Sequence, residues 1–125
     1  MNNLYIKPTL STPLIDFKTT GNLYIEGIST PENVSEFYKQ AFDWIKNFKS
    51  TKKDINFSMF FNYLNTSSTR MLVDLILNLK QLKEEGINVN FIWKYEDDDD
   101  DMLEMGEELE LVTDIKFEFK RVVAE

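Results

Sequence analysis

The sequence predicts an α/β fold built on a mixed β-sheet. Three observations support this class: several short strand-like runs near the N-terminus, two amphipathic helical stretches, and a strand–helix–strand succession between residues 55 and 95. Because a long helix separates the two strands of that succession, we expect a right-handed crossover between parallel strands. With a further short helix near the C-terminus, the prediction is a mixed sheet with about three helices.

The N-terminal part of the chain predicts a small β-meander. Residues 4–10 are expected to form an edge strand or an extended arm, since Pro8 cannot donate a hydrogen bond to a ladder. A second strand is expected at residues 14–17 and a third at residues 23–26, closed by Gly27. The residues between these strands are typical of turns.

A first helix is expected to begin within residues 29–33, which read S-T-P-E-N. Thr30 is the expected N-cap, Pro31 suits the first helical position, and Glu32 complements the helix dipole. Apolar residues then recur at steps of three and four, which predicts packing on the core, and Trp44 lies beside this stripe. The stripe consists of Val34, Phe37, Tyr38, Ala41, Phe42, Ile45 and Phe48.

Residues 55–64 alternate between apolar and polar side chains and predict a central strand. The next helix is expected to start at the N-T-S-S-T segment and to end before Gly86, which suits a left-handed position after a helix. Residues 89–95 alternate again and predict the next strand. The buried stripe of the intervening helix consists of Leu72, Leu75, Ile76, Leu79 and Leu82.

The acidic run at residues 96–101 predicts a solvated connection whose last aspartates favour the start of a third helix. That helix is expected at residues 102–111, where Gly106 weakens it. Residues 115–120 alternate and predict a final strand that closes the sheet.

Length and composition exclude several classes of protein. The 125 residues predict one domain spanning the whole chain, 1–125. The absence of histidine and cysteine excludes Ser-His-Asp and Cys-His catalysis, thiolate metal sites and disulfides. The net charge of −8 argues against nucleic acid as a partner. Neither a signal peptide nor a long apolar stretch is apparent, so we expect a cytoplasmic protein without membrane contact.

No catalytic, cofactor or metal motif emerges either. The acidic run lacks the alternation, central glycine and distal glutamate of a calcium loop. Glycine-rich phosphate-binding motifs and zinc spacings are missing, so no cofactor is expected. A pair of carboxylates could come from Asp43, Asp54, Asp74 or the acidic run, but nothing selects a pair. We therefore expect a protein that is not an enzyme.

One amide and four hydroxyls stand together where the central strand meets its helix: Asn65, Thr66, Ser67, Ser68 and Thr69. All five side chains can cap a helix. One cap needs only one such residue, however, and a helix N-terminus also favours a phosphate. The segment is therefore either a cap alone or a cap that carries a phosphorylation site.

Several motifs occur in an order that resembles the SiaC family of bacterial regulatory phosphoproteins, over essentially the whole chain. They are S-T-P at 11–13, I-E-G at 25–27, P-E-N at 31–33, Y-L-N-T-S-S at 63–68, the F-I-W-K-Y strand and the E-M-G-E-E helix. The resemblance implies a STAS-like domain of the anti-sigma-factor-antagonist type. It also implies partner switching, in which a switch-type serine/threonine kinase phosphorylates the protein and a metal-dependent serine/threonine phosphatase reverses this.

The family's phosphorylated threonine corresponds to Thr66, and the unphosphorylated form binds a downstream effector, in the best-known system a diguanylate cyclase. We expect Asn65, Ser67, Ser68 and Thr69 to support this site, together with Pro31, Glu32 and Asn33 at the start of the first helix. Ser67 or Ser68 as the phosphorylated residue stays open at this point. So do two other functions: a STAS-type adaptor without phosphorylation, and a binder of a nucleotide or other small anion at the helix N-terminus.

Overall fold

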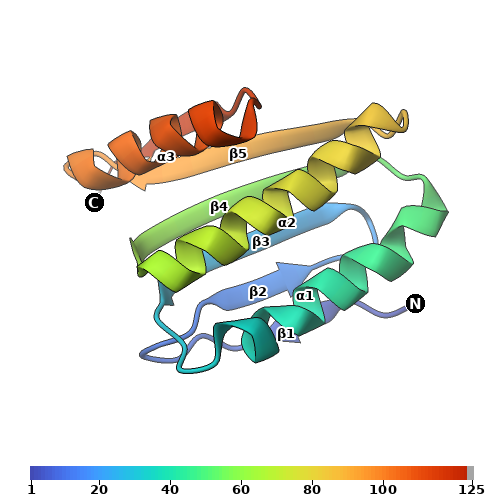
Figure 1. Ribbon diagram of the computed structural model, residues 1–125, viewed down its shortest axis with the longest axis horizontal. Coiled ribbons are helices and arrows are strands. Elements are labelled where there is room, and N and C mark those ends of the chain that lie inside the picture. Colours follow the sequence, from blue (N-terminus) through green and yellow to red (C-terminus); the bar gives the residue numbers. More distant parts are fainter. Residues whose placement is uncertain (124–125) are drawn as a thin grey trace.

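The computed structural model describes residues 1–123 and contains a six-stranded mixed sheet covered by three helices (Figure 1). The strands are β1 (Leu4–Ile6), β2 (Leu14–Phe17), β3 (Asn22–Ser29), β4 (Ile55–Leu64), β5 (Val89–Glu96) and β6 (Glu118–Val122). The helices are α1 (Val34–Phe48), α2 (Thr66–Glu84) and α3 (Asp100–Thr113), and a short 3-10 turn, η1 (Lys49–Thr51), follows α1. This arrangement confirms the predicted fold class.

Strand order in the sheet follows chain order from β1 to β6. The first three strands pair antiparallel, as the predicted meander requires, whereas β3, β4, β5 and β6 run parallel. Three successive crossovers in one direction place every helix on the same face of the sheet, which Figure 1 shows. The parallel strands β3, β4 and β5 therefore end, and the three helices begin, at one common edge.

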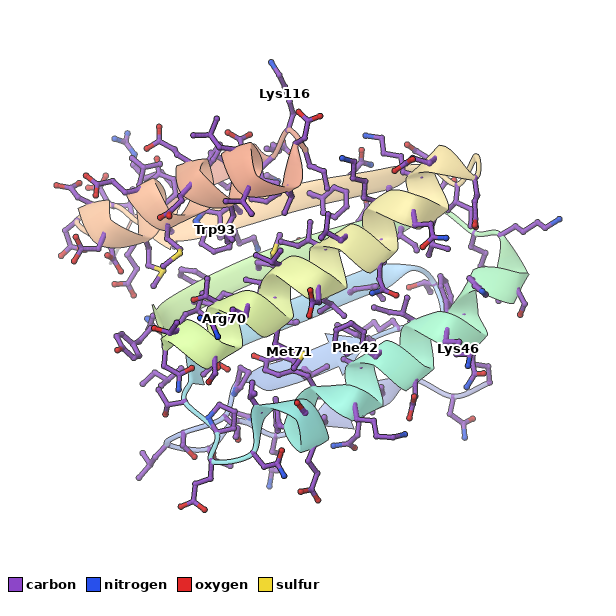
Figure 2. The ribbon with its side chains drawn as sticks, viewed as in Figure 1. Phe42, Lys46, Arg70, Met71, Trp93 and Lys116 are labelled. Carbon is purple, nitrogen blue, oxygen red and sulfur yellow. The ribbon has the colours of Figure 1, made fainter. Side chains whose placement is uncertain are left out.

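The core lies between this face of the sheet and the helices. Inward-facing residues of β4 and β5 alternate as predicted, and Phe57, Met59 and Trp93 are fully buried. The predicted stripe of α2 is buried in full, and Phe42 of α1 faces Met71 of α2 between the two helices (Figure 2). Burial of each large apolar side chain contributes roughly 1.5 to 3 kcal/mol to folding.

The start of α1 differs from the prediction. Asn33, not Thr30, is the N-cap: its side chain accepts a hydrogen bond from the backbone of Glu36 and donates one to the Glu36 carboxylate. Asparagine is also favoured over threonine at the N-cap, and the Glu36 carboxylate holds the Asn33 side chain in this position. Pro31 and Glu32 accordingly precede the helix. Thr30 instead donates its backbone N–H to Ser11 across the loop, at 2.7 Å.

One further boundary differs near the N-terminus. Gly27 does not close β3, which continues to Ser29; with φ of +118° this glycine lies at a shift in register with β4. Such an irregularity favours glycine, because other residues rarely adopt positive φ. Trp44, beside the stripe in sequence, is buried as well. Its ring stacks on Phe48 at 4.8 Å and its indole N–H donates to the Asn2 carbonyl at 2.9 Å.

The C-terminal elements are also shifted. Helix α3 begins two residues before the expected start, because Asp99 caps it, and ends at Thr113. Gly106 is not a weak point: an added Cβ there would lie 2.5 Å from ring atoms of Trp93, so the glycine permits close packing of α3 on β5. The last strand begins at Glu118 rather than residue 115, because the Phe117 N–H is bound by the Glu110 side chain at 2.7 Å instead of a strand.

Candidate functional site

The predicted site lies at the edge of the sheet where the parallel strands end. There the side chains of Asn33, Asn65 and Asp99 cap α1, α2 and α3 respectively. All three helices start on the left of Figure 1, so their positive dipole ends share one edge. The first turns of α1 and α3 contain acidic side chains, whereas that of α2 contains none. An added anion is therefore best accommodated at α2.

Asn65 is the N-cap of α2, whereas the sequence indicated only that each of the five side chains could cap the helix. Its Oδ1 accepts a hydrogen bond from the Ser68 backbone N–H at 2.8 Å and another from the Ser67 hydroxyl at 3.2 Å. The Thr69 hydroxyl donates to the Asn65 carbonyl at 3.0 Å, one turn earlier. Four of the five residues are thus joined by hydrogen bonds within the first turn, Ser68 through its backbone N–H.

Ser68 has a different environment, because its side chain is fully buried. Its hydroxyl accepts a hydrogen bond from the hydroxyl of Ser29 at 2.8 Å, and Ser29 lies 2.6 Å from the phenol oxygen of Tyr38. Since the Ser29 hydrogen is directed to Ser68, the Tyr38 phenol is the donor to Ser29. Burial raises the pKa of Tyr38 to about 12, so this phenol stays protonated as the donor. Ser68 is inaccessible to a modifying enzyme in this conformation.

Thr66 is the first residue of α2 and is exposed. Within residues 1–123, its side-chain oxygen makes no hydrogen bond, unlike the three other hydroxyls of the segment. Ser67 is exposed as well, but its hydroxyl is bound to the N-cap. Of the four hydroxyls, that of Thr66 is the one both exposed and unbound.

Thr66 also lines a groove between α2 and α3, hereafter the α2–α3 groove, with a volume of about 270 Å³. Arg70 stands one turn further along α2 on the same groove, and Glu108 faces it from α3. The remaining lining is mainly apolar. The complete lining is Leu64, Thr66, Thr69, Arg70, Val73, Met105, Glu108, Leu109 and Val112.

The loop before α1 is brought to the start of α2 through Ser29. In addition to the buried hydroxyl contact, the Asn65 backbone N–H donates to the Ser29 carbonyl at 3.2 Å. Glu32 and Asn33 are exposed nearby, whereas Pro31 is buried. In the described part of the chain, no hydrogen bond joins residues 31–33 to residues 65–69, so the two predicted parts of the site share an edge without direct polar contact.

Sequence reasoning missed three residues of this site: Ser29, Tyr38 and Arg70. Arg70 carried a detectable signal, because residues four apart on a helix are neighbours and Thr66 was already a candidate. Ser29 and Tyr38 carried none, since the hydrogen bond from Ser29 to Ser68 spans 39 residues.

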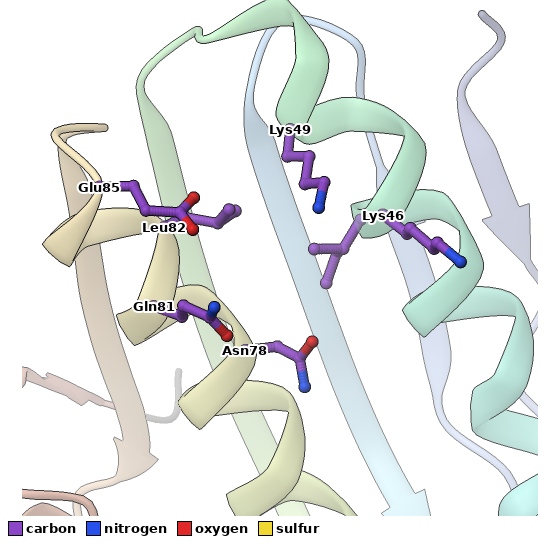
Figure 3. Close-up of a pocket in the computed structure, with 7 residues that line it drawn as sticks. Lys46, Lys49, Asn78, Gln81, Leu82 and Glu85 are labelled. Carbon is purple, nitrogen blue, oxygen red and sulfur yellow. The ribbon is translucent and has the colours of Figure 1, made fainter.

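A second pocket of about 210 Å³ lies between α1 and α2, at the opposite end of α2 from Thr66 (Figure 3). The side chain of Lys49 extends into the space between the helices, where Glu85 and two side-chain amides also lie, whereas the ammonium group of Lys46 points away from it (Figure 3). The pocket lies at the C-terminal ends of these helices, where the dipole disfavours anions. This pocket therefore does not match the alternative function left open by the sequence, in which a nucleotide or other small anion binds at the N-terminus of a helix. The lining is Ile45, Lys46, Lys49, Asn78, Gln81, Leu82 and Glu85.

The acidic run takes several separate roles. Asp99 caps α3, and Asp97 pairs with Arg121 at 3.1 Å.

Among residues 1–123, no helix is long and apolar enough to cross a membrane.

Comparison with known proteins identifies similar chains. Residues 6–122 match the family model described as SiaC family regulatory phosphoprotein. The structure is similar to that of SiaC of Pseudomonas aeruginosa, with a TM-score of 0.86, 30% sequence identity, and coverage of 99% of this chain and 100% of that one. A Pseudomonas aeruginosa crystal structure of the diguanylate cyclase SiaD in complex with its activator SiaC also matches, with a TM-score of 0.87, 30% identity, and 97% and 99% coverage. An uncharacterized protein of Pseudomonas aeruginosa strain UCBPP-PA14 is 32% identical over 111 residues, 86% of this chain and 87% of the relative.

Proposed function

Because this chain belongs to the SiaC family of regulatory phosphoproteins, we propose that it is a partner-switching regulator controlled by reversible phosphorylation of Thr66. The observation that carries this proposal is the state of the four hydroxyls at the start of α2. Ser68 is buried, Ser67 and Thr69 are bound to Asn65, and the Thr66 hydroxyl is exposed and unbound. A kinase that docks at this edge would meet Thr66 first.

The start of α2 suits a phosphate electrostatically. Phosphorylation adds about −1.5 to −2 charges at neutral pH. The helix dipole and unpaired N–H groups of a first turn favour an anion, and the first turn of α2 has no acidic side chain to oppose it. The modified residue would therefore leave the fold intact and change the surface.

We propose that a switch-type serine/threonine kinase transfers the γ-phosphoryl group of ATP to the Thr66 oxygen, releasing ADP and the hydroxyl proton. A metal-dependent serine/threonine phosphatase would hydrolyse the ester and restore the hydroxyl. Both enzymes would dock on the first turn of α2 and on the neighbouring loop that contains Glu32 and Asn33. Since the kinase uses ATP, the switch would operate in the cytoplasm.

The unphosphorylated form would bind a downstream effector at the same edge. We propose a diguanylate cyclase as the class of effector, supported by the SiaD–SiaC complex, in which SiaC is the activator. An interface built around the neutral Thr66 hydroxyl would have to bury an unmatched dianion after phosphorylation. Phosphorylation would thus release the effector.

The test is a binding titration of an effector cyclase from the same organism against three forms of the protein. These are the unmodified protein, the protein with phosphothreonine at position 66, and Thr66→Val, which keeps the shape of the side chain without its hydroxyl. We expect the phosphorylated form to bind at least about tenfold more weakly, which corresponds to about 1.4 kcal/mol, and Thr66→Val to bind nearly as well as the unmodified protein. Equal affinity of all three forms would favour an adaptor without phosphorylation.

A further inference from the structure

We infer that Arg70 binds the phosphate of phosphorylated Thr66, so that the pair closes the entrance of the α2–α3 groove. This inference rests on the proposed phosphorylation of Thr66. The two residues are four apart on α2 and line the same groove. At this spacing their Cβ atoms are about 5 to 6 Å apart, a distance that the long arginine side chain spans easily.

Arg70 is available for a new ionic partner. It is exposed, and the ion pairs found among residues 1–123 are Asp16–Lys18, Lys39–Asp43 and Asp97–Arg121, none of which involves Arg70. It is also the one cationic residue of the sequence between Lys53 and Lys80. Within the first two turns of α2, Arg70 is therefore the cation that can reach a phosphate on Thr66.

Glu108 is the competing anion, because its carboxylate lines the groove from α3. It forms no ion pair with Arg70 in the unphosphorylated protein, although both line the groove. A phosphate dianion carries more charge than a carboxylate and matches the planar guanidinium with two parallel hydrogen bonds. Phosphorylation is thus expected to direct Arg70 toward Thr66 and away from Glu108.

The consequence is a change at the groove itself. Its lining includes the buried or half-buried apolar residues Leu64, Val73 and Leu109, together with the exposed residues Thr66 and Arg70. A phosphate held against the guanidinium would cover the exposed part of this lining with a hydrated ionic pair. Arg70 would at the same time be lost to any other partner. Arg70 is in this sense a positioning residue for the phosphate.

The experiment installs phosphothreonine at position 66 during synthesis, without a kinase, and follows the second pKa of the phosphate by ³¹P NMR. We compare the otherwise unaltered protein with Arg70→Gln, Arg70→Lys and Lys83→Gln. The last variant changes the charge equally, about five turns away from Thr66 on the same helix. Circular dichroism confirms that each variant is folded.

Since a nearby cation favours the dianion, Arg70→Gln should raise the second pKa of the phosphate by about 0.15 to 0.4 unit, a roughly 1.4- to 2.5-fold change in proton affinity. Arg70→Lys should restore part of the effect, and Lys83→Gln should leave the pKa unchanged. An unchanged pKa in Arg70→Gln, or an equal shift in Lys83→Gln, would overturn the inference. Because no kinase is used, a negative NMR result would argue against the role of Arg70 without arguing against the phosphorylation of Thr66. Conversely, a kinase that fails to phosphorylate Thr66 would argue against the proposed function without changing the NMR result.

Discussion

The hydroxyl of Ser29 donates a hydrogen bond to the buried hydroxyl of Ser68 at 2.8 Å, which joins the end of β3 to the first turn of α2. Tyr38 of α1 completes the chain of hydroxyls through its 2.6 Å contact with Ser29. Hydrogen bonds between side chains therefore link the start of α2 to β3 and, through Ser29, to α1. The Ser68 hydroxyl is therefore structural, because it is buried and hydrogen-bonded, whereas the Thr66 hydroxyl is exposed.

We expect Ser68→Ala to lower the free energy of unfolding by about 1 to 2 kcal/mol, because the Ser29 hydroxyl loses its buried acceptor. Ser67→Ala should change it by less than about 0.5 kcal/mol, since that side chain is exposed. Urea denaturation of both variants measures the difference. Equal stability of the two variants would show that the buried contact contributes nothing.

Stability should fall in alkali because of Tyr38. Burial raises the pKa of Tyr38 to about 12 from its ordinary value of 10.0, so between these values the unfolded chain loses a proton that the folded protein keeps. The group's contribution is full below pH 10 and decreases by up to about 1.4 kcal/mol per pH unit above it. Burial and Glu26 also raise the pKa of Tyr24, which acts in the same direction.

The check is urea denaturation between pH 9 and 11.5 of the wild-type protein and Tyr38→Phe. The variant should show a shallower loss of stability above pH 10, with the slope from Tyr24 remaining. Identical slopes in the two proteins would contradict the burial of a protonated phenol at Tyr38.

Gly106→Ala should destabilise the protein by about 1 to 3 kcal/mol, although alanine is normally the better helix former. The added methyl group would lie 2.5 Å from the Trp93 ring and 2.8 Å from that of Phe119. Trp93 cannot move easily, because it is fully buried and its indole N–H donates to the Met102 carbonyl at 2.9 Å. Glu107→Ala, at the exposed neighbouring position, serves as the control in thermal denaturation. A stabilised Gly106→Ala would show that α3 does not pack this closely.

The electrostatic preference of the α2 N-terminus can be tested without phosphate. We expect Thr66→Asp to be more stable than the neutral Thr66→Asn by about 0.3 to 1 kcal/mol at low ionic strength, because the aspartate complements the helix dipole. The difference should shrink in high salt. Denaturation midpoints of the two variants at both salt concentrations measure it. An asparagine variant as stable as the aspartate one at low salt would remove the electrostatic support for a phosphate here.

Local chemistry predicted much of the fold. The alternation of residues 55–64 predicted β4 with the observed bounds, and the following helix starts at the N-T-S-S-T segment as expected. Gly86 adopts φ of +102°, and the neighbouring N–H groups bind the last turn of α2. These features depend on side chains close in sequence, so the pattern carries the necessary information.

The errors arose where distant contacts decide. Thr30 has the chemistry of an N-cap, but its backbone is bound to Ser11, and the nearby pair of Asn33 and Glu36 begins the helix instead. The sequence indicated that Gly106 weakens α3, because the sequence pattern does not reveal the close tertiary contact between this glycine and Trp93. At the candidate site, the sequence indicated a cluster of hydroxyls but could not rank them. The exclusion of Ser68 depends on its burial and on its hydrogen bond from Ser29, 39 residues away in sequence.

The most direct measurement is peptide mapping by mass spectrometry after incubation with ATP and the cognate switch kinase, with wild-type protein beside Thr66→Ala and Ser67→Ala. We predict one added phosphate on Thr66 in the wild type and in Ser67→Ala, and none in Thr66→Ala. With a kinase shown to be active, a phosphate that persists in Thr66→Ala, or no phosphate on the wild-type protein, would contradict Thr66 as the switch.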